Sequence, residues 1–175
     1  MNIRPATQAD IPSITAIYAH HVLHGTGTFE TEPPSETEMA QRWRDVLSRG
    51  LPYLLVETQG KVMGYAYANW FKPRPAYRFS AEDSIYMHPD AVGQGLGTQL
   101  LSELLTQLER LGVRQVLAVI GDSNNQGSVG LHQKLEFERI GVMACVGWKF
   151  GRWLDVVMMQ KTLGEGATTA PTETP

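Results

Sequence analysis

The fold of this chain is decided by residues 84–101, which read SIYMHPDAVGQGLGTQLL. The apolar run Ile85–Met87 predicts a strand, and Pro89 ends it. Leucines then recur at spacings of three and four from Leu100 onwards, which predicts a helix that buries one face. The stretch therefore reads as a strand, a glycine-rich turn and a helix.

Three glycines, Gly93, Gly95 and Gly97, alternate between the predicted strand and the predicted helix. Glycine has no Cβ, so the backbone can approach a ligand closely and can adopt positive φ. The first turn of the helix adds unpaired N–H groups and the positive end of the helix dipole. Together these features predict a seat for an anion such as a phosphate, although a tight turn without a ligand would use the same glycines.

The glycine spacing differs from two common phosphate loops. A dinucleotide fingerprint needs Gly-x-Gly-x-x-Gly, whereas this loop reads Gly-x-Gly-x-Gly. A P-loop ends in Gly-Lys-Ser/Thr, whereas Thr98 follows Gly97 directly. Residues 92–97, VGQGLG, resemble instead the pyrophosphate loop of the GNAT family of N-acetyltransferases, Gln/Arg-x-x-Gly-x-Gly/Ala, from which Val92 departs.

This resemblance implies that acetyl-coenzyme A is the co-substrate, that no metal takes part, and that the fold is α/β with a mixed, mostly antiparallel central sheet flanked by helices. A second segment, residues 125–132, resembles the family motif Asn-x-x-Ser-x-x-Leu-His. Asn124 or Asn125 would also cap the helix that begins there. The residues implied to contact the coenzyme are Ile85, Tyr86, Met87, Gly93, Gln94, Gly95, Leu96, Gly97, Thr98, Asn124, Asn125 and Ser128.

Composition sets the broad class of the protein. The 175 residues predict one domain, with 42% hydrophobic and 19% charged residues. The net charge of −3 argues against a nucleic-acid surface, and no apolar run reaches the roughly 18 residues that would span a membrane. The lone Cys145 excludes a disulfide framework, and the first residues lack the apolar core of a signal peptide. A cytoplasmic protein is the expectation.

Periodicity and turn residues divide the chain into a regular order of elements. Helices are expected to begin at Thr7 and Ser35, each with an acidic residue three positions on, and the second is expected to bury Met39, Trp43 and Leu47. The order β-α-α-β-β-β-α-β-α-β-β matches the acetyltransferase fold over residues 1–163, and residues 164–175 are expected to form a disordered tail. The strands are predicted over residues 2–4, 51–57, 62–70, 80–88, 115–121, 137–150 and 153–161.

Two residues are candidates for catalysis. The segment 81–86 resembles the Glu-bearing segment of phosphinothricin acetyltransferases, which implies that Glu82, and not Asp83, is the general base that deprotonates the amine. His132 matches a histidine implicated in the same subfamily. From the residues alone, the pattern favours a solvated acidic pair at a strand end, and His132 could equally be a packed helix residue. Because no tyrosine follows Tyr86, the thiolate is expected to leave without a tyrosine as proton donor.

The residues that would bind the acceptor lie in two predicted loops, at residues 25–34 and 71–79. Residues 28–32 and 146–155 resemble the phosphinothricin and methionine sulfoximine acetyltransferases, which implies a small α-amino acid with a tetrahedral phosphorus or sulfur end. Arg74 and Arg78 can supply forked hydrogen-bond donors to its oxygens. The full set of candidate substrate residues is Phe29, Glu30, Arg74, Tyr77 and Arg78, although plain surface loops would carry the same residues.

Several alternatives stay open. The enzyme could acetylate protein N-termini or polyamines, although the basic loop at residues 72–78 disfavours a polyamine, or the chain could sense an acyl-coenzyme A without reacting. The spacing of His20 and His24 suits a metal, but no third ligand lies beside them. The aromatic, basic segment Trp148–Trp153 favours an interface, and the family is often dimeric, so a homodimer is expected.

Overall fold

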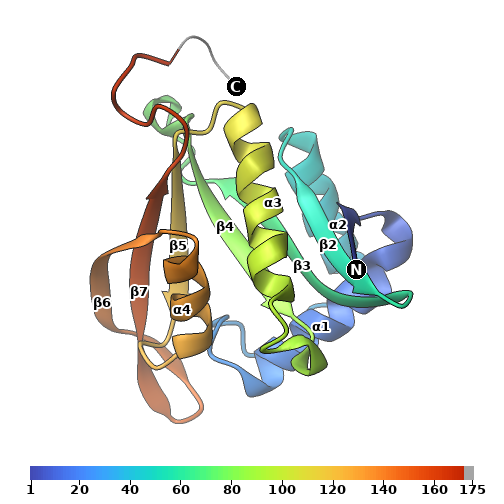
Figure 1. Ribbon diagram of the computed structural model, residues 1–175. Coiled ribbons are helices and arrows are strands. Elements are labelled where there is room, and N and C mark those ends of the chain that lie inside the picture. The colour runs from blue at the N-terminus through green and yellow to red at the C-terminus, as the bar shows by residue number, and fades with distance from the viewer. Residues whose placement is uncertain (172–175) are drawn as a thin grey trace.

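The structure, a computed structural model, describes residues 1–171 and is built on one seven-stranded sheet in the order β1-β2-β3-β4-β5-β7-β6 (Figure 1). Every neighbouring pair of strands is antiparallel except β4 and β5, which run parallel. The predicted mixed, mostly antiparallel sheet is therefore confirmed. The strands are β1 (Asn2–Pro5), β2 (Tyr53–Thr58), β3 (Lys61–Trp70), β4 (Ser80–Met87), β5 (Gln115–Gly121), β6 (Glu138–Lys149) and β7 (Arg152–Thr162).

Helices cover both faces of this sheet. They are α1 (Ile11–His24), α2 (Glu36–Ser48), α3 (Leu96–Arg110) and α4 (Gln126–Lys134). Helix α3 lies across β2, β3 and β4 on one face, with α4 beside it, whereas α1 and α2 lie behind the sheet (Figure 1). The leucines of α3 form the centre of the core, because Leu100, Leu101, Leu104 and Leu108 are fully buried. Among the described residues, no helix is long and apolar enough to cross a membrane.

A hydrogen-bond network centred on Asp10 joins β1 to the turn that precedes α1. The Asp10 carboxylate accepts hydrogen bonds of 2.8 Å from the backbone N–H and the hydroxyl of Thr7, which confirms Asp10 as the acidic partner of that helix start. It also accepts two hydrogen bonds of 2.8 Å from the Arg4 guanidinium. These bonds, those from Arg4 above all, lower the pKa of Asp10 to about 2. The ionised carboxylate therefore stabilises the folded protein.

We expect Asp10→Asn to lower the free energy of unfolding by about 2 kcal/mol at pH 7, because it removes charge-assisted hydrogen bonds at a buried site. The folded pKa of Asp10 lies below its unfolded value of roughly 4, so this stabilisation is complete above pH 4. It is lost as the pH falls toward about 2. Denaturant unfolding at several pH values measures the difference. Asp45→Asn, on the exposed side of α2, is the control and should cost less than about 0.5 kcal/mol.

Helix α2 buries a slightly different face from the one predicted. Met39 and Val46 are buried and Trp43 packs against the core, but Leu47 is 41% exposed, so the prediction for Leu47 is wrong. The reason is the helical period. At 100° per residue, position 46 lies about 20° from position 39 around the helix axis, whereas position 47 lies about 80° away.

The ends of α4 and of the described chain show two further local features. Glu136, just after α4, adopts φ +63°, the left-handed conformation that favours glycine. Residues 164–171 form turns, and Arg114 donates to the Gly166 carbonyl at 3.4 Å, in a part of the chain for which the sequence predicts disorder. Residues 172–175 of that predicted tail lie outside the described part of the chain.

Candidate active site

The centre of the sheet opens into a groove between β4 and β5. The two strands pair only from Ser80 to Asp83 on β4 and from Gln115 to Ala118 on β5, and they separate beyond that point. Residues 84–87 and 119–120 then line a cavity of about 870 Å³, which the start of α3, α4 and the end of α1 complete. The groove thus lies where the parallel pair ends, which is a usual place for ligand sites in α/β sheets.

The glycine loop forms one end of this groove. Gly93 has φ +79° and Gly95, the N-cap of α3, has φ +75°. A Cβ at either position would meet no other protein atom within 4 Å. Glycine is therefore needed here for the backbone conformation, and the space beside the loop is left free for a ligand. An open cradle of backbone at a helix N-terminus fits the pyrophosphate of a coenzyme.

Most of the residues predicted to hold the coenzyme line this groove. They are Ile85, Tyr86, Met87, Gly93, Gly95, Gly97, Thr98, Asn124, Asn125 and Ser128. Gln94 and Leu96 do not line it. The Gln94 amide donates to the Asp90 carbonyl at 2.6 Å, and the Leu96 side chain packs into the core. Since neither side chain lines the groove, any contact of these two residues with a ligand there would be made by their backbone groups.

Helix α4 brings a second set of polar groups to the groove. Asn125 is its N-cap, since its side chain accepts a hydrogen bond of 3.2 Å from the Ser128 N–H, and its amide donates to the Gly121 carbonyl at 3.4 Å. Asp122, with φ +71°, precedes this cap and accepts a 2.6 Å hydrogen bond from Arg152 on β7. Asp122 and Arg152 both line the groove and were not among the sequence candidates.

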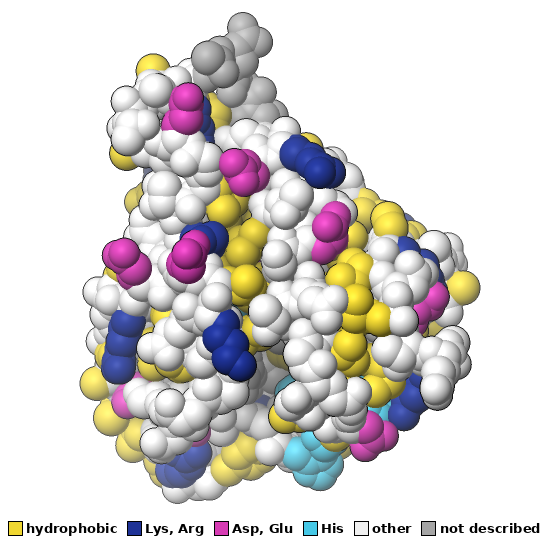
Figure 2. Space-filling view, viewed as in Figure 1, with side chains coloured by type: hydrophobic (Ala, Val, Ile, Leu, Met, Phe, Trp, Pro, Cys, Tyr) yellow, Lys and Arg dark blue, Asp and Glu magenta, His cyan; other side chains and the backbone are white. Residues whose placement is uncertain are grey.

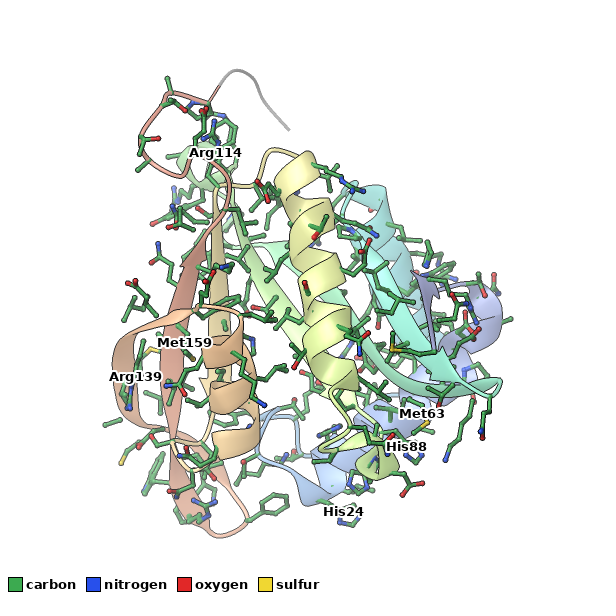
Figure 3. All side chains as sticks on the ribbon, viewed as in Figure 1. His24, Met63, His88, Arg114, Arg139 and Met159 are labelled. Carbon is green, nitrogen blue, oxygen red and sulfur yellow. The ribbon has the colours of Figure 1, made fainter. Side chains whose placement is uncertain are left out.

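The histidines of α1 approach the groove from the other side. His21 and His24 line it, and His21 Nε2 lies 2.8 Å from the Met87 carbonyl oxygen. Figure 3 places His24 at the end of α1 and His88 just before the glycine loop, at the same end of the molecule.

In the space-filling view of the face that carries α3 and α4, charged side chains of both signs are scattered among polar ones (Figure 2). The described residues contain no group of three metal-ligating side chains.

Glu82 lies on β4, one residue before the groove begins, and its side chain points to the α1 and α2 face. It sits opposite Asn69 of β3, in line with Ser84 and Tyr86, and Tyr86 stacks edge-on against Tyr18 of α1 at 4.9 Å. The carboxyl is half-buried, and burial and then the charge of Asp83 raise its pKa, against a smaller effect of Lys72. A carboxylate with a raised pKa is a stronger base, which suits the predicted role.

Asp83 and His132 form a buried pair in the wall of the groove, on the opposite face from Glu82. His132 Nε2 lies 3.0 Å from Asp83 Oδ2, and the two side chains are 3% and 1% exposed. His132 Nδ1 lies 2.8 Å from the Ser128 carbonyl oxygen. Burial alone would lower the pKa of His132, but the hydrogen bond and the charge of Asp83 outweigh it and raise that pKa.

The loop between α1 and α2 is anchored to β6 by Lys149. The Lys149 ammonium is buried and donates hydrogen bonds of 2.8 Å to the carbonyl oxygens of Gly25 and Thr28. The Phe29 ring packs against two glycines, because a Cβ on Gly121 or Gly147 would lie 2.8 or 2.2 Å from its atoms. The loop is therefore held in a fixed position beside the end of β5.

The other end of this loop is fixed by Glu30. Its carboxylate accepts 2.9 Å and 2.7 Å hydrogen bonds from the Tyr18 hydroxyl and the Arg42 guanidinium. Since these partners already occupy Glu30, the structure gives it a clear role in holding the loop. Its predicted contact with the substrate stays a prediction.

We expect Gly147→Ala to displace Phe29 and to lower the free energy of unfolding by about 1–3 kcal/mol, the usual cost of overpacking. The KM for the acceptor should rise, because the loop that carries Phe29 moves, while the KM for acetyl-coenzyme A stays the same. Gly141→Ala is the matched control on the same strand, because a Cβ there meets nothing within 4 Å. Denaturant unfolding and steady-state kinetics measure both. Equal stability of the two variants would show that the Phe29 contact is not tight.

The basic loop between β3 and β4 lies outside the groove. Residues 72–78 are exposed, Tyr77 packs edge-on against Phe71 at 5.8 Å, and the Arg78 guanidinium lies 4.7 Å from the centre of the Phe79 ring. Arg74, Tyr77 and Arg78 do not line the cavity, so their contact with a substrate stays a prediction. Lys72 of this loop is close enough for its charge to influence the Glu82 carboxyl.

Comparison with known proteins adds independent information. The acetyltransferase (GNAT) family model matches residues 15–137. A phosphinothricin N-acetyltransferase of Alcaligenes faecalis is 52% identical over 97% of this chain and 86% of its own length. An L-methionine sulfoximine/L-methionine sulfone acetyltransferase of Pseudomonas paraeruginosa is 41% identical over 93% of this chain and 94% of its own length. The crystal structure of a phosphinothricin acetyltransferase from Sinorhizobium meliloti, in complex with acetyl-CoA, aligns with a TM-score of 0.94 at 49% identity, covering 98% of this chain and 93% of that chain.

Proposed function

Because the chain belongs to the acetyltransferase (GNAT) family, we propose that it transfers the acetyl group of acetyl-coenzyme A to the α-amine of a small amino acid analogue. The acceptors we propose are L-methionine sulfoximine, L-methionine sulfone and L-phosphinothricin, which the names of the relatives suggest. The observation that carries the proposal is the groove at the β4–β5 separation, with the glycine cradle at one end and Glu82 on the adjoining face.

Binding of the coenzyme, binding of the acceptor and proton transfer are carried out by different residues in this proposal. The backbone of residues 93–98 holds the pyrophosphate, and Asn124, Asn125 and Ser128 contact the arm that leads to the thioester. Glu82 takes the proton from the amine, directly or through water. Phe29, Arg74, Tyr77 and Arg78 contact the acceptor. The fixed geometry of the groove brings amine and thioester together, which supplies a large part of the rate.

A steady-state panel of amines with acetyl-coenzyme A tests the proposal. The panel contains the three analogues, methionine, a peptide with a free N-terminus and spermidine, and free thiol release is followed with a disulfide reagent. The proposal expects the highest kcat/KM for an analogue with a tetrahedral phosphorus or sulfur end. A preference for the peptide would favour a protein N-terminal acetyltransferase, and a preference for spermidine would favour a polyamine acetyltransferase. Coenzyme binding without turnover of any amine would favour a sensor.

We further propose that two copies of the chain form a homodimer through β6 and its turn. Large apolar side chains are 41–60% exposed there, and β6 is the edge strand of the sheet. Trp148 and Trp153 pack edge-on at 5.2 Å and remain 58% and 60% exposed. A cluster of exposed aromatic residues on an edge strand favours association with a second copy. The exposed side chains are Ile140, Val142, Met143, Val146, Trp148, Phe150 and Trp153.

Sedimentation at micromolar concentration should give a dimer, and Trp148→Glu should convert it to a monomer, because a charge would enter the buried centre of the interface. Leu47→Glu is the control, since Leu47 is 41% exposed on α2, which packs against β2 and β3 and not against β6. A monomeric parent protein, or equal behaviour of the two variants, would contradict this interface. A cytoplasmic location stays a prediction from the composition of the sequence.

A further inference from the structure

The protons of the Asp83–His132 pair can be assigned from its geometry. The Ser128 carbonyl oxygen, 2.8 Å from His132 Nδ1, can only accept, so Nδ1 carries a proton. Nε2 lies 3.0 Å from Asp83 Oδ2, and an unprotonated Nε2 beside an ionised carboxylate would set two lone pairs against each other. A second proton must therefore lie between Nε2 and Oδ2. The pair holds one proton more than a neutral imidazole and a carboxylate hold together.

This proton lies in the wall of the groove. Asp83 is the last β4 residue that pairs with β5, and both Asp83 and His132 line the cavity that begins there. Asp83 Oδ1 is buried and, within residues 1–171, has no hydrogen-bond partner. An unpartnered carboxylate oxygen in the wall of a cavity is costly unless a ligand contacts it. The pair is therefore placed to interact with whatever lies at this point of the groove.

The transfer reaction needs an acid on this face. The sulfur of the leaving thiol gains the electron pair of the broken C–S bond and has to be protonated. Tyr86 is the last tyrosine in the sequence, so α4 has none, and burial raises the pKa of Tyr86 far above that of a thiol. Glu82 points to the other face of the sheet and is needed there as a base.

We propose that the Asp83–His132 pair is the acid that protonates the departing thiolate. The proposal rests on the acetyltransferase function proposed above. As the C–S bond breaks and its electrons stay on sulfur, the pair gives sulfur the proton held between Nε2 and Oδ2. Glu82 takes one proton from the protonated amine before the attack and passes it to water, and it takes the second N–H proton as the tetrahedral intermediate collapses. The products are an amide, a thiol and one proton released to water overall, because Glu82 releases two protons and the pair regains one.

The arrangement explains why two adjacent carboxylates differ in role. Successive residues of a strand point to opposite faces, so Glu82 faces the α1 and α2 side and Asp83 faces α4. Both residues line the groove, and Asp83 is a positioning residue because it acts through its hydrogen bond to His132. Other ionisable groups around the groove are His21 and His24 of α1, Lys134 of α4, and the pair Asp122–Arg152. Within residues 1–171, the hydrogen bonds of the His132 ring go to Ser128 and Asp83.

A titration of the protein without ligand tests the proton assignment. NMR of the imidazole nitrogens, with His132 identified by its loss in His132→Gln, should show a midpoint above the ordinary value of about 6.5. Asp83→Asn should lower that midpoint by at least about one pH unit, because the carboxylate no longer favours the imidazolium. An unchanged midpoint in Asp83→Asn, or one below about 6 in the parent, would overturn the assignment.

Kinetics with two acetyl donors test the role. With acetyl-coenzyme A, both His132→Gln and Asp83→Asn should lower kcat/KM by about 10–10²-fold. With S-acetyl-4-nitrothiophenol, whose thiolate is stable without a proton, the loss should fall to less than about threefold. Equal losses with both donors would show that the pair only holds α4 in place and would overturn the proposal. His20→Gln, on α1 and outside the groove, is the control for loss of a histidine.

The two proposals fail in different ways. If none of the amino acid analogues is acetylated, the proposed function is wrong, but the titration still reports the proton of the pair. The comparison of donors then uses whichever amine the panel identifies. If the analogues are acetylated and the donor comparison shows no difference, only the role of the pair is wrong. Circular dichroism confirms that each variant is folded before the kinetics are interpreted.

Discussion

Glu82→Gln should lower kcat at pH 7 by at least about 10²-fold, the lower end of what a positioned base contributes. An α-amine is mostly protonated at this pH, so a base is needed before nitrogen can attack. Glutamine keeps the shape of the side chain and removes its basicity. The KM for acetyl-coenzyme A should barely change, because Glu82 does not line the groove. Steady-state kinetics at saturating acceptor measure both constants.

The pH dependence makes the result specific. The pKa of Glu82 is raised, so the parent enzyme should lose activity as the pH falls through that raised pKa, where the carboxylate becomes protonated. At high pH free amine is abundant and the variant should recover. The difference between parent and variant is therefore largest near neutral pH. Glu138→Gln, an exposed residue at the start of β6, is the control. If Glu82→Gln keeps a near-normal kcat and a flat pH profile, Glu82 is not the general base, and another group or water takes the proton.

Gly95→Val should raise the KM for acetyl-coenzyme A by about 10²-fold. The side chain would fill the open space beside the loop, and valine tolerates the φ of +75° poorly, so backbone N–H groups that face the pyrophosphate are lost. Two charge-assisted hydrogen bonds at about 1.5 kcal/mol each account for an effect of this size. Calorimetric binding of coenzyme A gives the same quantity without turnover.

The effect of backbone strain at positive φ has to be separated from the loss of contacts with the coenzyme. A glycine at the other end of α3 provides the control. Gly112 has φ +83°, and a Cβ there also meets no protein atom within 4 Å. Gly112→Val should therefore lose a similar amount of stability, on the order of 1–2 kcal/mol, and keep its coenzyme affinity. If both variants bind the coenzyme as the parent does, the loop does not hold the pyrophosphate.

The local parts of this site could be predicted from the sequence. The strand, the glycine turn and the helix at residues 84–110 follow from short-range patterns, and their residues meet along one groove. A cap at Asn124 or Asn125 follows in the same way, because it depends on neighbours within a few positions, and the structure places it at Asn125. Even the opposite directions of Glu82 and Asp83 could be predicted from strand alternation.

The long-range contacts could not be predicted. Lys149 meets the carbonyls of Gly25 and Thr28 across more than 120 positions of sequence, and no local pattern marks a lysine in an aromatic run as buried. Phe29 was a substrate candidate because it stood out in a polar loop, yet its ring packs against Gly121 and Gly147. The position of Arg152 in the groove could not be predicted either, because its partner Asp122 lies thirty residues away in the sequence.

The separation of β4 from β5 has a consequence for backbone stability. Strands β1–β4 form one half of the sheet and β5, β7 and β6 form the other, and within residues 1–171 the two halves pair with each other at four positions, Ser80–Asp83 with Gln115–Ala118. Beyond these positions the facing edges of β4 and β5 do not pair with each other, so their backbone groups border the groove. A molecule that spans the groove contacts both halves at once. Coenzyme binding should therefore slow amide exchange on both sides of the groove, in residues 84–87 and 119–121 together.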